Sequence, residues 1–154
     1  MIVNSRQQLT FPSPLGPITL ESNGDCLTAL SFGDHGGVDN SSLLLEAQKQ
    51  LNAYFSGLLR TFTLPLFYNG TAFQNRVWTV LGEISYGKTI SYRELAQRID
   101  CPKGFQAVGG ANSRNPLPIL IPCHRVIAHN GGLGGYSGGL DAKRFLLNLE
   151  ELHT

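Results

Sequence analysis

A cysteine and a histidine stand side by side at the end of a short apolar run, and this arrangement limits what the second half of the chain can form. The run Pro118–Ile121 leads into Pro122–Val126, which reads Pro-Cys-His-Arg-Val, and the glycine-rich segment Asn130–Gly139 follows. A short apolar run predicts a buried segment, whereas repeated glycines predict a loop. The pattern therefore predicts a fold that delivers Cys123 and His124 from its core to the edge of a loop.

Cys123 is a candidate nucleophile. A thiolate, not a thiol, reacts, so a reactive cysteine needs a base, a cation or a helix start nearby to lower its pKa from about 8.5. His124 and Arg125 are the adjacent candidates for this task. The alternative for a lone Cys-His pair is a buried structural thiol beside a surface histidine, since free cysteine is among the most buried residue types. Cys26 and Cys101 bring the total to three, without CxxC spacing, so a disulfide framework is not expected.

The first half of the chain alternates strand-like runs with turn signals. Asn23-Gly24 between two such runs is a strong hairpin signal, so we expect a small antiparallel sheet. Helical spacing of apolar residues from Leu44 to Leu58 predicts one helix packed on the sheet, with Gly57 near its end. The predicted strands are Gln7–Phe11, Pro17–Glu21 and Cys26–Phe32, with Thr61–Leu66 as a candidate fourth.

The second half reads as helical. Thr71 and Gln74 form a capping box that opens a helix ending at Tyr86-Gly87. Ser91 opens a short helix that runs through Ile99, and a second follows over Phe105–Ser113. Two short helices joined by a tight turn are a candidate helix-turn-helix.

The second of these helices contains Gly109 and Gly110 in its interior. Glycine costs about 1 kcal/mol relative to alanine in a helix, so the pair needs a reason. Close approach of another molecule is one explanation. Tight packing of the helix on its own core is the other, and the pattern alone does not choose between them.

Charge divides unevenly along a chain of 154 residues whose net charge is +1. Residues 1–70 hold three Lys or Arg against five Asp or Glu, which gives −2, and residues 71–154 hold nine against six, which gives +3. A mildly basic second half is compatible with contact to phosphates. The sequence has neither an apolar run long enough to span a bilayer nor a signal peptide, so we expect a cytoplasmic protein with access to the nucleoid. Cysteine and histidine spacing predicts no metal site, and no cofactor is expected.

The segment Asn115–Glu150, with Pro-Cys-His-Arg-Val-Ile, Gly-Tyr-Ser-Gly-Gly-Leu, Lys143 and Glu150, closely resembles the active-site region of the O6-alkylguanine-DNA alkyltransferases, or methylated-DNA-protein-cysteine methyltransferases. The resemblance is close from Phe73 to Glu150 and loose before it. It implies an α+β fold with two domains: residues 1–70 as an α/β lobe of ribonuclease H-like type, and residues 71–154 as a mostly helical DNA-binding and alkyl-transfer domain. It also implies stoichiometric transfer of an alkyl group from O6-alkylguanine in DNA to Cys123, once the base has flipped out of the duplex.

Roles follow from the resemblance, position by position. Cys123 is implied as the nucleophile, His124 as its base through a water, and Glu150 as the group that orients the imidazole. Tyr92 is implied as the proton donor to the departing guanine, and Asn115 as a brace beneath Cys123. The residues implied to bind the base are Val126, Tyr136, Ser137 and Lys143. The residues implied to contact DNA in the minor groove are Ser91, Tyr92, Gln106, Ala107, Gly109, Gly110, Ala111, Asn112, Arg114 and Arg125.

Gln106 departs from the pattern, since the family usually has an arginine there that fills the gap left by the flipped base. A neutral amide lacks the charge and stacking plane of a guanidinium, so we expect weaker DNA binding or slower repair. The expected partner is double-stranded DNA containing O6-alkylguanine, bound by a protein that is a monomer in solution and does not act at a membrane. Cooperative assembly on DNA and activity on O4-alkylthymine stay open.

Three other functions compete with this interpretation. One is a protein that binds alkylated DNA with weak or no transfer, which Gln106 favours and Cys123 opposes. Another is a thiol hydrolase, although such enzymes take the histidine from elsewhere in the chain. The third is a transcription regulator, but the predicted second helix offers only Gln106 and Asn112 for direct reading of bases.

Overall fold

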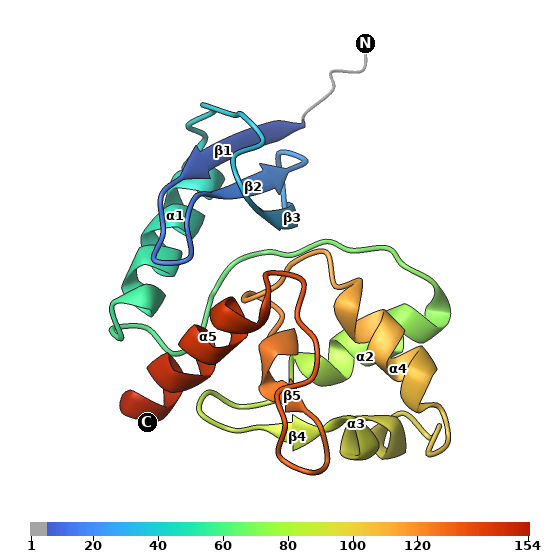
Figure 1. Cartoon of the computed structure of the whole chain (residues 1–154). Helices are drawn as coiled ribbons and strands as arrows, with labels where there is room; N and C mark the ends of the chain where they lie inside the picture. Colours follow the sequence, from blue (N-terminus) through green and yellow to red (C-terminus); the bar gives the residue numbers. More distant parts are fainter. Residues whose placement is uncertain (1–5) are drawn as a thin grey trace. The chain divides into compact units, whose positions relative to one another are not determined.

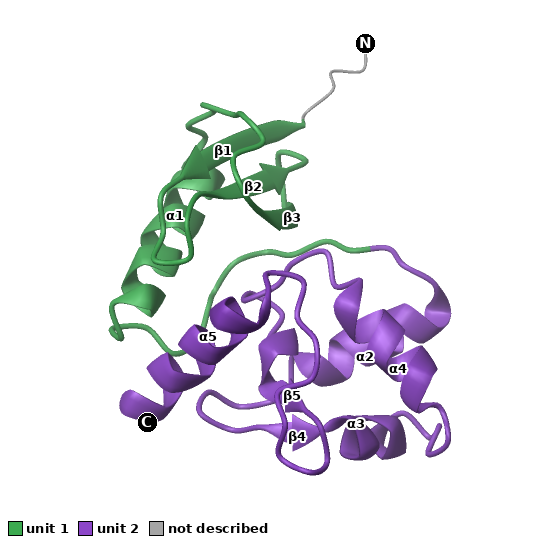
Figure 2. Ribbon diagram, viewed as in Figure 1, with its two compact units in different colours: residues 1–68 green, residues 69–154 purple. Residues whose placement is uncertain are grey.

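The computed structural model describes residues 6–154 and divides into two compact units, residues up to 68 and residues 69–154 (Figure 2). The two units differ in their secondary structure. Unit 1 carries a three-stranded sheet and one helix, whereas unit 2 carries the remaining helices and a two-stranded pair (Figure 1). The α+β class expected from the sequence is therefore confirmed.

Unit 1 is built on an antiparallel sheet with strand order β1-β2-β3. Its strands are β1 (Gln7–Phe11), β2 (Ile18–Ser22) and β3 (Leu27–Phe32), and Leu20 lies between Leu9 and Leu30 in the register. Helix α1 (Ser42–Phe55) packs its buried residues, including Leu44 and Leu51, on this sheet. The predicted fourth strand is absent from the described chain. Only Leu66 of that segment forms a bridge, to Leu27.

Helix α2 (Ala72–Leu81) opens unit 2 with the predicted capping box, in which Thr71 and Gln74 bond each other's backbone N–H groups. The helix ends at Leu81 with Gly82 as its cap, so the predicted end at Tyr86-Gly87 was wrong. Ile84 is buried although it lies in the turn beyond the helix. Its burial extended the apolar stripe past the end of the helix and caused the error.

The helix pair follows the prediction closely. Helix α3 (Tyr92–Arg98) is capped by Ser91, whose hydroxyl accepts from Glu94 N–H, and helix α4 (Phe105–Ser113) packs against both α2 and α3. Asp100, in the turn between α3 and α4, has a φ of +59°, which lets the chain reverse sharply.

Two further features of unit 2 were not predicted. Strand β4 (Ile90–Ser91) pairs in parallel with β5 (Val126–Ile127), and this pairing sets Tyr92 beside the segment that follows Cys123. Helix α5 (Leu140–Leu152) supplies Lys143 and Glu150. Its buried residues Ala142, Leu146 and Leu149 follow helical spacing, which is the signal that could have revealed it.

Candidate active site

Cys123 begins a single turn of 3-10 helix, η1 (Cys123–Arg125), held from below by a tightly bonded loop. The Asn115 side chain donates from Nδ2 to the carbonyl of Ile121 at 2.8 Å and accepts from the N–H of Leu117 at 2.9 Å. Ile119, fully buried in this loop, has a φ of +73°. Such a conformation is strained for a β-branched residue and persists only where the surroundings enforce it. The loop therefore fixes where the thiol lies.

The thiol itself is buried, with Cys123 only 3% exposed. Burial raises the pKa of Cys123 to about 11, although a hydrogen bond from Asn115 and the positive charge of Lys143 act in the opposite direction. The expectation that His124 and Arg125 lower this pKa is therefore not met. At neutral pH the resting group is a thiol, and reaction requires a base to remove its proton.

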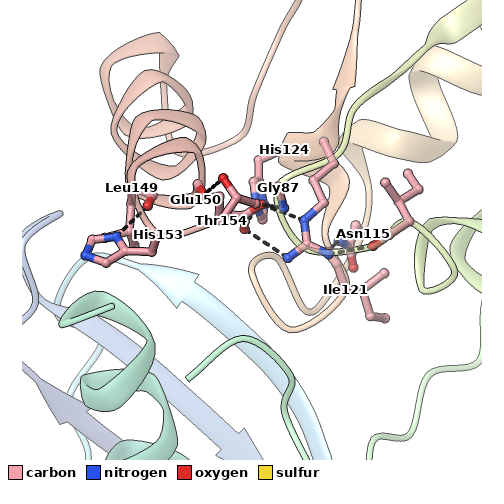
Figure 3. A network of polar contacts seen from close by, with 10 residues as sticks. Gly87, Asn115, Ile121, His124, Leu149, Glu150, His153 and Thr154 are labelled. Carbon is pink, nitrogen blue, oxygen red and sulfur yellow. Dashed lines mark hydrogen bonds and ion pairs between the residues drawn. The ribbon is translucent and has the colours of Figure 1, made fainter. Parts of the chain in front are cut away.

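His124 and Arg125, the two residues that follow Cys123, belong to a buried ion-pair network centred on Glu150 (Figure 3). His124 Nε2 lies 2.7 Å from Glu150 Oε2, and the Arg125 guanidinium donates to both oxygens of Glu150 at 2.8 and 2.9 Å. The N–H of Gly87 adds a fourth contact to this carboxylate at 3.2 Å. Burial alone would raise the pKa of Glu150, but the hydrogen bonds from His124 and Arg125 outweigh it and hold that pKa far below its usual range.

The network also decides which nitrogen of His124 is free. An ionised carboxylate only accepts hydrogen bonds, so Nε2 must carry the proton and Nδ1 must present a lone pair. Nδ1 is buried and has no hydrogen-bond partner among the described residues. Burial lowers the pKa of His124 below its usual value, with Glu150 opposing the change in part. His124 is thus a neutral imidazole with one unused acceptor.

Lys143 ties the glycine-rich loop to the strand that follows the active-site turn. Its Nζ donates to the carbonyls of Val126 at 2.7 Å and Gly135 at 3.1 Å. Burial lowers the pKa of Lys143 to about 8, and a thiolate at Cys123 would raise it. The ammonium group therefore supports the loop and favours negative charge on the sulfur.

Tyr92 and Tyr136 stand at the thiol from two different segments. Burial and the charge of Cys123 raise the pKa of Tyr92, and burial with the charges of Cys123 and Glu150 raises the pKa of Tyr136. Both phenols therefore keep their protons at neutral pH. Tyr136 meets the His124 ring edge to face at 6.5 Å. Gly134, with a φ of +71°, lies so close to the Tyr92 ring that a Cβ there would come within 2.8 Å of it. Ser137 lies exposed on the same loop.

Helix α4 presents one face to solvent and one to the core of unit 2. Gln106, Ala107, Gly110 and Arg114 are exposed, and Gly109 is half-buried. A Cβ built on either Gly109 or Gly110 would meet no atom within 4 Å. Tight packing on the core of unit 2 therefore does not explain why these positions are glycine. The other explanation, close approach of another molecule, is consistent with the open space.

Three residues predicted to contact DNA are buried instead. Ala111 and Asn112 are each 4% exposed; Ala111 accepts from the Trp78 indole at 2.9 Å, and Asn112 Nδ2 lies 3.5 Å from the Cys123 carbonyl. Arg125 is 7% exposed and bonds Glu150 and the carbonyl of Ile84. Because all three are buried, the structure does not support the contact with DNA that the resemblance implied for them. Ser91 caps α3 with its side chain and is half-buried.

Several groups in the site could not be found from the sequence because they act through the backbone. They are the N–H of Gly87, the carbonyls of Ile84, Ile121 and Gly135, and the bare Cα of Gly134.

Among the described residues no cluster of three or more His, Cys, Asp or Glu could hold a metal ion. No helix in residues 6–154 is long and apolar enough to cross a membrane.

Both units match known families. Residues 9–68 match the ribonuclease-like domain of 6-O-methylguanine DNA methyltransferase, and residues 72–152 match the DNA binding domain of the same enzyme. A methylated-DNA--protein-cysteine methyltransferase of Methanosarcina acetivorans is 47% identical over 148 residues, covering 91% of this chain and 95% of its own. The constitutive enzyme of that name from Bacillus subtilis is 41% identical, covering 93% and 94%.

Solved structures agree. Mycobacterium tuberculosis OGT in complex with DNA superposes with a TM-score of 0.88 at 43% identity, covering 96% of this chain and 94% of its own. An O6-methylguanine DNA methyltransferase from Methanococcus jannaschii gives 0.70 at 30% identity, covering 95% of both chains. The matches span both units and the segment that carries the buried thiol, so the chain belongs to the 6-O-methylguanine DNA methyltransferase family.

Proposed function

We propose that the protein repairs DNA by taking the alkyl group of an O6-alkylguanine onto Cys123, once per molecule. The observation that carries the proposal is a buried thiol followed in the chain by a buried His124 that is paired with Glu150, in a unit with an exposed helix face that includes Ala107 and Gly110. A thiol that is 3% exposed cannot meet a base stacked in a duplex, so the base must leave the stack to reach it.

The free acceptor on His124 supplies the base. His124 Nδ1 takes the thiol proton through a water, while Glu150 stabilises the imidazolium and Lys143 the thiolate. The thiolate attacks the alkyl carbon, a C–S bond forms, and the C–O6 bond breaks with its electron pair leaving on the guanine. Tyr92 donates its phenolic proton to that guanine and regains one from the imidazolium. The net result is that the proton lost by the thiol is replaced by one gained by the guanine, and the reaction needs no oxidant or cofactor.

The remaining site residues position the base. The Val126 backbone, Ser137 and Tyr136 surround the guanine, and Asn115 holds the turn beneath the sulfur. On DNA, the contacts come from the exposed positions Gln106, Ala107, Gly110 and Arg114, with Gly109, Ser91 and Tyr92 beside them. The partner is double-stranded DNA carrying O6-alkylguanine, met by a monomer. The place of action is the cytoplasm, where thiols stay reduced.

A thioether is stable, and the other two cysteines lie elsewhere, Cys26 in unit 1 and Cys101 in the turn before α4. Reaction is therefore stoichiometric. The alternative of a damage-binding protein without transfer is not favoured, because the thiol is present and the relatives carry methyltransferase names.

The test is incubation with a duplex containing one O6-methylguanine, followed by intact mass and peptide mapping. One methyl group on Cys123 and conversion of the lesion to guanine are expected. Cys101→Ser should label as the wild type does and Cys123→Ser should not. A duplex that is bound and left unchanged by the wild type would make the protein a damage sensor instead.

The glutamine at position 106 predicts that the rate of transfer from duplex DNA and the rate from a free base respond differently to substitution. Its neutral amide leaves the chemistry intact but gives the displaced base a poor replacement, so Gln106→Arg should speed transfer from duplex DNA more than from free O6-benzylguanine. Single-turnover rates with both substrates measure this. An equal effect on both, or none on the duplex, would contradict the expectation.

A further inference from the structure

An exposed aromatic side chain begins the helix that faces DNA in the proposed function. Phe105 is the first residue of α4 and is 46% exposed. Leaving an aromatic ring in water gains the fold little, and single exposed apolar residues need no explanation by themselves. The surroundings of Phe105 are what give it meaning.

A cavity of about 280 Å³ lies beside the ring, lined by Tyr92, Arg93, Phe105, Ala128 and His129. Two of the lining residues, Arg93 and His129, are exposed donors that suit phosphate or base edges, and none is acidic. Aromatic rings beside an exposed cation, Arg93, and an exposed imidazole match a nucleotide, whose base offers an apolar face and whose backbone is an anion.

The cavity shares Tyr92 with the surroundings of the thiol, since the charge of Cys123 acts on the Tyr92 phenol. Phe105, Gly109 and Asn112 are spaced four and three residues apart, so they lie along one line of α4. At the far end of that line, Asn112 Nδ2 lies 3.5 Å from the Cys123 carbonyl, and a hydrogen bond from the Asn112 side chain lowers the pKa of Tyr92. Gly109, in the middle, leaves open space where a side chain would stand. A planar group placed against Phe105 would therefore share Tyr92 with the base bound at Cys123.

We propose that Phe105, with Arg93 and His129 at its sides, forms a second nucleobase site that holds a base neighbouring the flipped guanine by stacking. The site stabilises the opened duplex while the guanine occupies the pocket at Cys123. This inference rests on the proposed function, because it concerns how the same duplex is held open. It assigns to Phe105 a positioning role and none in the transfer of the alkyl group.

The first experiment compares Phe105→Ala with the wild type in single-turnover transfer from an O6-methylguanine duplex and from free O6-benzylguanine. Loss of stacking should lower the duplex rate roughly 5-fold to 100-fold. The rate with the free base should change by less than about twofold, since no neighbouring base is present. Phe105→Trp should keep the duplex rate and Phe105→Leu should not. Phe67→Ala is the matched control, because Phe67 is 51% exposed and belongs to unit 1.

The second experiment identifies the stacked base by a double-mutant cycle. Duplexes carry an abasic residue in place of the 5′ neighbour, the 3′ neighbour or the base opposite the lesion. At one of these positions the difference between wild type and Phe105→Ala should disappear, since the stacking partner is gone. The inference is overturned if no position shows this coupling, if Phe105→Ala keeps the wild-type duplex rate, or if both substrates slow equally. Failure of the proposed function would appear separately, as a wild type that transfers nothing to Cys123.

Discussion

At the scale of single residues, the site depends on which proton each group carries. The sequence places Cys123 and His124 side by side, yet their chemistry depends on groups from other segments, such as Glu150, which bonds both His124 and Arg125. Only the family resemblance pointed to Glu150. The resemblance also implied that Arg125 contacts DNA, yet its side chain turns inward to Glu150, because position in a motif does not reveal which side chains of a short turn are buried.

The lowered pKa of His124 predicts how repair depends on pH. A base works only when neutral, and burial moves the protonation of this imidazole to a pH below its ordinary value of 6.5. The rate of transfer from free O6-benzylguanine should therefore stay level through neutral pH and fall only below 6.5. Single-turnover rates across a pH series, with circular dichroism at each pH to check folding, measure this.

Glu150→Gln provides the matching variant. Glu150 raises the pKa of His124, so its loss should move the acid limb lower still, while the level rate drops roughly 100-fold or more because the imidazolium is no longer stabilised. A wild-type midpoint above 6.5 would show that His124 is not the base that limits the rate.

At the scale of elements, periodicity and caps predicted most of the fold correctly. The three strands and the helix pair appear where the pattern placed them, and the Thr71 capping box is present. The end of α2 was missed because Ile84 is buried without being helical, and β4 with β5 was missed because a two-residue parallel pair leaves no periodic signal. Tertiary contacts decide both cases.

Helix α4 carries a prediction of opposite effects on stability and binding. Gly110 has open space around it, so Gly110→Ala should stabilise the protein by about 0.5–1 kcal/mol through the helix propensity of alanine. The added methyl group should weaken binding to duplex DNA, which the glycine lets approach closely. Urea unfolding and duplex titration measure the two effects.

Gly134→Ala is the contrast for the same chemical change. Its φ of +71° and the nearby Tyr92 ring predict a loss of stability and slower transfer even from the free base. Duplex binding by Gly110→Ala that equals the wild type would show that close approach to DNA is not the reason for the glycine.

At the scale of the whole molecule, the two units differ in charge as well as in fold. The sequence shows this asymmetry directly, with −2 in residues 1–70 and +3 in residues 71–154. The structure adds that Arg93, Arg98, Lys103 and Arg114, on and between α3 and α4, are exposed, and that Arg98 is paired with Glu94. Arg125 and Lys143 contribute to the count but are buried at the site, so they cannot reach phosphates. The net charge of a segment thus overstates what its surface offers to DNA.

This distribution predicts the salt dependence of binding. Each phosphate contact contributes about −0.9 to the slope of log K against log salt, so Arg93, Lys103 and Arg114, without the ion-paired Arg98, predict a slope of roughly −3. Arg114→Ala should reduce its magnitude by about 1, and Gln106→Arg should increase it by about 1. Lys49→Ala, a change at an exposed cation on α1 of unit 1, should leave it unaltered. Duplex titrations at several salt concentrations give the slopes. A slope that responds equally to Lys49 and Arg114 would mean that both units contact phosphates and that the helix pair alone does not carry the electrostatic part of binding.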